Sequence, residues 1–190
     1  MNTHIVVEDA FAAALLERVL PSAGAPDIRI VVGGAQMTAL SMGCSLRVDR
    51  FPVIVLLDAR SVDEASIREQ QREDEFFLCD VGPPLPAALV LAVPAAEVVL
   101  FHDVSALERL LAAPISERSR IEARFIPAQV LAERLRASGR FGSDVELVRA
   151  LDAATAKRLS AHPLIQTLER HVAEFRAVLA PPATELRRTG

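Results

Sequence analysis

The sequence predicts an α/β protein with a four-stranded, mainly parallel sheet flanked by helices, followed by a helical C-terminal extension. Two observations predict this fold. In the first half of the chain, short runs rich in β-branched residues alternate with amphipathic stretches, which is typical of βαβ units. After residue 95 these runs stop and helical patterns follow one another. We therefore expect an α/β domain at residues 1–112, a helical extension packed on it at 113–180, and a flexible tail at 181–190.

Each expected strand is a short apolar run that ends at a turn or a charged residue. The strands are expected at residues 4–7, 27–32, 53–57 and 88–93. The third run, VIVLL, has no polar alternation, which favours a central strand covered on both faces.

The expected helices follow from apolar spacing and from their start signals. They are expected at residues 9–20, 35–46, 62–71, 97–101, 105–111, 127–137 and 163–179, with a further start at 143. Ser61 and Glu64 have the spacing of a capping box, and so do Ser143 and Glu146. Pro127 suits the first position of a helix.

Composition limits the class of protein. With 190 residues, of which 51% are hydrophobic and 24% charged, the chain has the balance of one compact folded unit. No apolar stretch approaches the roughly 20 residues that span a bilayer, and the first residues lack the pattern of a secretory leader. Two cysteines, Cys44 and Cys79, cannot make a disulfide framework, and neither has a CxxC partner, which favours a reducing compartment. We expect a cytoplasmic protein without membrane contact.

Charge and aromatic content argue against a general nucleic-acid binder. The formal net charge is −4, Lys157 is the only lysine, and the chain has no Trp or Tyr on which bases could stack. The densest basic stretch contains Arg118, Arg120, Arg124, Arg134, Arg136 and Arg140. Acidic residues are interspersed among them, so a solvated helix surface is the first interpretation and a track for a phosphate backbone is the alternative.

Two acidic residues follow predicted strands directly. Glu8 comes after the first strand and Asp58 after the third. Ligands of open parallel sheets bind beyond the carboxyl ends of the strands, and two carboxylates there could share Mg²⁺ or Mn²⁺. A metal so placed can polarise a phosphodiester and activate water. The structural alternative is that Asp9 and Asp58 are helix N-caps.

The order of these endings resembles the topoisomerase-primase (Toprim) fold. In this chain, the first expected strand ends in Glu, the second in Gly-Gly, the third in Asp-x-x, and the fourth near Pro-x-x-Glu. The resemblance covers roughly residues 5–111 and is greatest to overcoming-lysogenization-defect (OLD) nucleases and to small Toprim-like proteins associated with ABC-class ATPases. It implies that Glu8 acts as general acid or base and that the motif beginning at Asp58 holds Mg²⁺. It further implies nucleic acid as substrate, an ATPase as partner and a role in phage defence.

The chain also departs from the Toprim pattern. Asp9 replaces the usual glycine after the Glu, and Ala12 replaces an acidic residue. Arg60 replaces the second Asp of Asp-x-Asp, where a positive charge at about 4 Å would cost a bound cation on the order of 4 kcal/mol per unit charge. Asp63 and Glu97 could compensate as metal ligands.

Arg60 has two further interpretations, since it could bind a phosphate or form an ion pair with Glu8 or Asp58 that replaces the metal as a clamp. A tight turn is the first interpretation of Gly33 and Gly34, and the alternative is that they bring backbone N–H groups to a phosphate. The leading expectation is a Toprim-like metal-dependent nuclease or nuclease-derived subunit. The alternative is a catalytically degenerate Toprim-fold interaction or regulatory protein.

Overall fold

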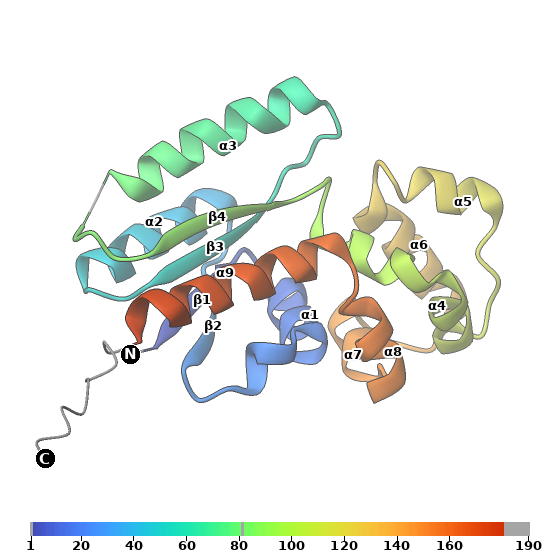
Figure 1. The fold of residues 1–190 in the computed structure, drawn as a ribbon. Coiled ribbons are helices and arrows are strands. Elements are labelled where there is room, and N and C mark those ends of the chain that lie inside the picture. Colours follow the sequence, from blue (N-terminus) through green and yellow to red (C-terminus); the bar gives the residue numbers. More distant parts are fainter. Residues whose placement is uncertain (1, 81, 181–190) are drawn as a thin grey trace, which may run out of the picture.

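A computed structural model of the chain describes residues 2–80 and 82–180, and the expected tail at 181–190 lies outside this range. The strands are β1 (Thr3–Val7), β2 (Ile28–Val32), β3 (Val53–Asp58) and β4 (Ala87–Ala92). They form one sheet in the order β2-β1-β3-β4, and every neighbouring pair is parallel (Figure 1). The predicted fold class is therefore confirmed.

Helices cover both faces of the sheet. The described helices are α1 (Ala10–Val19), η1 (Pro21–Gly24), α2 (Gln36–Val48), α3 (Glu64–Cys79), η2 (Ala96–Asp103), α4 (Val104–Leu111), α5 (Glu117–Glu122), α6 (Pro127–Ser138), α7 (Asp144–Arg149), α8 (Ala153–Leu159) and α9 (Pro163–Leu179). Here η1 and η2 are 3-10 helices. Helices α2 and α3 lie on one face, and α1 and α9 lie on the other.

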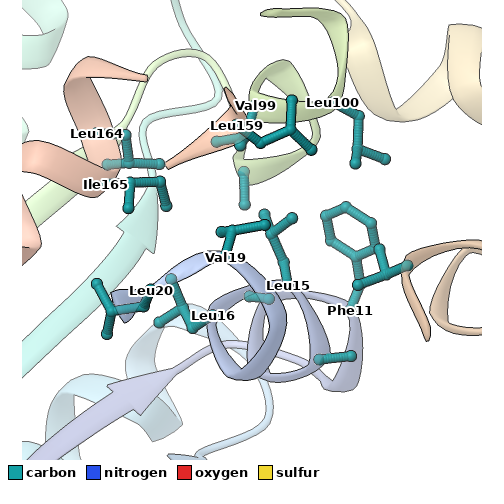
Figure 2. Packing of buried hydrophobic residues seen from close by; sticks show 14 of the residues in the cluster. Phe11, Leu15, Leu16, Val19, Leu20, Val99, Leu100, Leu159, Leu164 and Ile165 are labelled. Atoms are coloured by element: carbon teal, nitrogen blue, oxygen red, sulfur yellow. The ribbon is translucent and has the colours of Figure 1, made fainter. Parts of the chain in front are cut away.

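Side chains alternate along each strand, so each face of the sheet supports its own apolar cluster. On the α2 and α3 face, Val6 and Val55 pack with Leu40 and Leu78. The larger cluster on the opposite face continues through η2 and the later helices. Figure 2 shows α1 meeting η2, α8 and the start of α9 there. One continuous core thus joins the sheet to the helices after residue 112.

The third helix begins and ends later than predicted. Asp63, and not Ser61, is its N-cap, because the Asp63 carboxylate accepts from the N–H of Ser66 at 2.8 Å. The hydroxyl of Ser61 instead accepts from the N–H of Asp63. The predicted capping box was therefore wrong, and the helix continues to Cys79.

Other boundaries agree more closely with the sequence. Ser143 caps α7, α6 begins with Pro127, and α9 covers Pro163–Leu179 as expected. Two short helices, α5 and α8, were not predicted. Across the described part of the chain, none of the helices has the length and apolar character needed to cross a membrane.

Candidate functional site

The candidate site lies where the connections from two neighbouring strands diverge. Strand β1 lies beside β3, with Val7 opposite Leu56. From β1 the chain proceeds to β2 on one side, and from β3 it proceeds to β4 on the other. Crevices at such switch points are the usual ligand sites of open parallel sheets. Glu8 and Asp58 both lie here, as the sequence predicts.

Both carboxylate oxygens of Glu8 are already engaged. Its Oε1 accepts from the backbone N–H of Asp58 at 2.7 Å, and its Oε2 accepts from Nη2 of Arg60 at 2.6 Å. The Glu8 side chain is only 10% exposed, whereas that of Arg60 is 59% exposed. The guanidinium therefore forms a charge-assisted hydrogen bond at the solvent side of a buried carboxylate. Arg60 could bind a phosphate or form an ion pair that replaces the metal as a clamp, and this contact matches the ion pair.

The backbone around Arg60 is fixed by further pairing with the chain after β4. The N–H of Ala59 donates to the carbonyl of Ala92 at 2.8 Å, and that of Arg60 donates to the carbonyl of Pro94 at 2.7 Å. Arg60 itself has φ of 55°, a left-handed conformation that is uncommon outside glycine. The clamp is thus built on a backbone that the neighbouring segment holds in place.

Asp58 and Glu97 form the inner part of the site. Oδ1 of Asp58 accepts from the N–H of Ala96, the first residue of η2, at 3.0 Å. Asp58 is therefore not the N-cap of the following helix α3, which Asp63 caps. Glu97 follows on η2 and is nine-tenths buried. Within the described part of the chain, its Oε2 has no hydrogen-bond partner. This arrangement places two carboxylates in a region of low solvent access.

Burial perturbs both carboxyl groups. It raises the pKa of Asp58 to about 6; the negative charges of Glu8 and Asp9 act in the same direction, while the N–H of Ala96 opposes them. Burial likewise raises the pKa of Glu97 to about 7, with a contribution from the negative charges of Asp58 and Asp9. Near neutral pH, a substantial fraction of Glu97 is therefore protonated.

The four acidic residues surround one small cavity. Glu8, Asp9, Asp58 and Glu97 line a space of about 10 Å³, together with apolar side chains that include Phe11. This volume is close to the minimum that holds a single water molecule. Asp9 also caps α1 by accepting from the N–H of Ala12 at 2.8 Å, as the structural alternative predicts. The sequence analysis did not predict that Asp9 lines the cavity. Its position directly after Glu8 could have indicated it.

This donor set does not fit the expected Mg²⁺ or Mn²⁺. Magnesium requires near-octahedral oxygen ligands at about 2.0–2.1 Å and usually keeps several waters, for which this cavity has no room. The oxygens of Glu8 are occupied by Arg60 and by a backbone N–H. Over residues 2–80 and 82–180, no group of three or more His, Cys, Asp or Glu side chains is arranged to hold a metal ion.

Besides Arg60, three predicted site residues lie outside this cavity. Asp63 is exposed at the start of α3, where hydrogen bonds from Ser66 lower the pKa of its carboxyl. The N–H of Gly33 donates to the carbonyl of Val7 at 2.8 Å, and a Cβ at Gly33 would overlap the backbone of Ala39. Gly34 has φ of 102°. Close packing at Gly33 and a positive φ at Gly34 therefore account for the glycine pair.

The arginine-rich stretch falls on α5, the connection to α6, α6 itself and the segment that follows it. Arg118 pairs with Glu122 at 2.7 Å on the same helix, and Arg120 pairs with Glu108 at 2.9 Å. These arginines are thus partly neutralised by neighbouring carboxylates, which matches the solvated helix surface.

Comparison of the chain with protein-family models, with curated proteins and with solved structures found no match.

Proposed function

We propose that this chain is a catalytically degenerate Toprim-like protein that acts through interaction with a partner and has no nuclease activity. The observation that carries the proposal is the ion pair between Arg60 and Glu8 at 2.6 Å. A general acid or base must present a free oxygen to the proton that it transfers. Both oxygens of Glu8 serve structural contacts instead.

Electrostatics supports the same proposal. Arg60 stands at the position of the second Asp in Asp-x-Asp, and its guanidinium lies against the acid that the resemblance assigns to catalysis. An arginine remains protonated at any physiological pH, so this positive charge is permanent. It neutralises Glu8 in the way that a bound cation would, while offering no site for water activation. The sheet and its switch point remain as a scaffold.

The test compares cation binding and DNA cleavage by the wild type and by Arg60→Asp. The variant recreates the Asp-x-Asp pattern, and Asp is among the residues that tolerate a left-handed backbone. We expect the wild type to show no thermal stabilisation by Mg²⁺ or Mn²⁺ and no nicking of plasmid DNA. We expect Arg60→Asp to gain cation-dependent stabilisation, because the substitution frees Oε2 of Glu8 and adds a carboxylate next to the four that line the cavity.

A matched control separates this gain from a general change in charge. Arg68→Asp makes the same substitution on the exposed side of α3, where the side chain of Arg68 forms an i,i+4 ion pair with Glu64. It should leave the response to cations unchanged. The proposal fails if the wild type nicks DNA with Mn²⁺ and Glu8→Ala abolishes this activity without changing the unfolding midpoint.

The second candidate is the metal-dependent nuclease itself, working with an ATPase partner in phage defence. The observation that favours it is that half-buried Asp58 and buried Glu97, both with raised pKa values, line one cavity. Such perturbed groups are frequent at active sites. This candidate requires Arg60 to leave Glu8, and cleavage by the wild type in the test above would favour it.

We also infer a cytoplasmic location for either candidate. Cys44 and Cys79 are both free thiols, which suits a reducing compartment.

A further inference from the structure

A cavity of about 320 Å³ lies between the end of α1 and helix α8, which is beside α1 in Figure 1. Residues 18–21 form one wall, and residues 153, 156, 157 and 160 form the other. The spacing of the second set places its members on one face of α8. None of these residues lines the cavity at Glu8 and Asp58. The volume is at the lower end of the range for small-molecule pockets, so a ligand of this cavity is short.

The inner part of the cavity is apolar. Val19, Leu20 and Ala156 line it, and all three are buried. Figure 2 shows Val19 and Leu20 at the end of α1, within the larger apolar cluster. Pro21 and Ala153 extend the apolar lining to the surface. A group that enters the cavity therefore gains most from an apolar chain.

Two exposed cations line the same cavity. They are Arg18 on α1 and Lys157 on α8. Over residues 2–80 and 82–180, neither side chain forms an ion pair. The acidic residues next to this lining in the sequence, Glu17 and Asp152, do not line the cavity. The positive charge at the mouth of the cavity is thus not opposed by a carboxylate of its own lining, which favours an anion.

A backbone contact orients the guanidinium of Arg18. Its Nε donates to the carbonyl of Leu151 at 2.7 Å, and its Nη2 donates to the same oxygen. A carbonyl carries no formal charge, so this contact holds the guanidinium in place without neutralising it. A guanidinium held in this way loses less freedom when it binds a carboxylate or phosphate.

Helix ends explain only part of this arrangement. Arg18 and Lys157 each lie in the last turn of a helix, where the macrodipole favours a cation. The macrodipole does not explain why both side chains line one apolar cavity. A second cavity with two arginines differs, because Asp152 lines it together with Arg109 and Arg140. The junction of α1 and α8 therefore combines an apolar interior with unopposed positive charge.

We propose that the cavity between α1 and α8 binds an amphipathic anion, a carboxylate or phosphate monoester that carries a short apolar chain. The chain of the ligand packs against Val19, Leu20 and Ala156. Its anionic head group lies at the mouth of the cavity and accepts hydrogen bonds from Arg18 and Lys157. This site goes beyond the proposed function, because it requires neither the residues around Glu8 nor a protein partner.

The probes share one eight-carbon chain and differ in charge. Octanoate and octyl phosphate are the anions, 1-octanol is neutral, and octylamine is a cation. In titrations of the full-length chain followed by amide NMR, we expect at least one anion to bind with a dissociation constant of about 0.1–1 mM. Its signals should move at Leu20, Ala156 and Lys157. We expect 1-octanol to bind about tenfold more weakly and octylamine not to bind.

The two anions identify the head group, and inorganic phosphate and acetate test the need for the chain. Both lack the apolar part and should bind at least tenfold more weakly than the octyl anions. The proposal is overturned if neither octyl anion binds at about 10 mM, or if 1-octanol binds as tightly as they do.

Two pairs of variants locate the binding site. Lys157→Glu should weaken binding of the anion at least tenfold, whereas Arg149→Glu, the same change of charge at an exposed position of α7 that does not line the cavity, should have little effect. Ala153→Leu fills the mouth of the cavity and should also weaken binding. Ala154→Leu, at an exposed neighbour outside the lining, is its control. Equal losses in a variant and its control contradict the proposal.

The single lysine gives an independent readout. Lys157 is the only lysine of the chain, so its acetylation by an N-hydroxysuccinimide ester, followed by peptide mass spectrometry, reports on one side of the cavity. The octyl anion that binds should slow this reaction severalfold, and 1-octanol should not. An unchanged rate at saturating anion overturns the contact with Lys157 and leaves the proposed function unaffected. Conversely, metal-dependent cleavage by the wild type would contradict the proposed function and leave anion binding intact.

Discussion

Replacing Glu97 by Gln should stabilise the protein at alkaline pH and leave its stability nearly unchanged in acid. Glu97 is buried, no described residue forms a hydrogen bond with its Oε2, and its pKa is raised from 4.5 to about 7. Below pH 4.5 the carboxyl is protonated in both the folded and unfolded states. Between these two values the unfolded state releases the proton first, so the free energy of unfolding falls as pH rises. Glutamine has no such titration.

The size of the effect follows from the two pKa values. Each pKa unit corresponds to about 1.4 kcal/mol, so the interval between 4.5 and about 7 corresponds to roughly 3 kcal/mol. The difference in free energy of unfolding between Glu97→Gln and the wild type should therefore grow by about 3 kcal/mol from pH 4.5 to pH 8. In a chain of this size, that corresponds to a shift of roughly 6–12 °C in the unfolding midpoint.

The assay is urea unfolding, followed by circular dichroism, at intervals between pH 4.5 and pH 8. The readout is how the difference in free energy of unfolding between Glu97→Gln and the wild type changes with pH. The cost of burying the glutamine amide does not depend on pH, so it does not contribute to this change. Glu69→Gln, at an exposed position of α3, is the matched control and should show no such change. A difference that stays constant across this range would refute the assignment of a buried, destabilising carboxylate at Glu97.

Three further substitutions test the structural roles described above. Leu168→Ala removes a side chain with 0% exposure from the larger apolar cluster and should lower the free energy of unfolding by about 2–5 kcal/mol in denaturant titrations. Gly33→Ala forces a Cβ against the backbone of α2 and should cost about 1–3 kcal/mol, whereas Gly24→Ala, where a Cβ has open space, should cost far less. Glu8→Gln keeps an oxygen acceptor but loses the charge that pairs with Arg60. We expect a loss of about 1 kcal/mol that shrinks in high salt, and an unchanged unfolding curve would argue against the clamp.

The sequence predicts the scaffold well because its signals are local. The β-branched runs place the four strands, and a parallel sheet with neighbouring β1 and β3 then brings Glu8 and Asp58 to the same edge. The ion pair between Arg60 and Glu8 was one of several open alternatives. Its formation depends on a left-handed backbone at Arg60, and no residue pattern indicates that conformation at an arginine.

The rest of the site depends on contacts between distant segments. The buried position of Glu97 follows from the path of η2, which brings its first N–H to Asp58 across a separation of 38 residues. The spacing of Ser61 and Glu64 matches a capping box, yet Asp63 caps α3 because its own carboxylate reaches the N–H of Ser66. The spacing of residues in the sequence therefore does not determine whether Ser61 or Asp63 caps α3.

The position of α9 affects how the chain is made. This helix is the last described element, yet it supplies Leu164, Ile165 and Leu168 to the cluster that covers the α1 face of the sheet. On the ribosome, the four strands emerge long before these residues do. The nascent chain therefore displays an apolar sheet surface until α9 has emerged, and such a surface favours aggregation and chaperone binding. A truncated chain that ends before residue 163 should be prone to aggregate, even though it contains all four strands of the sheet.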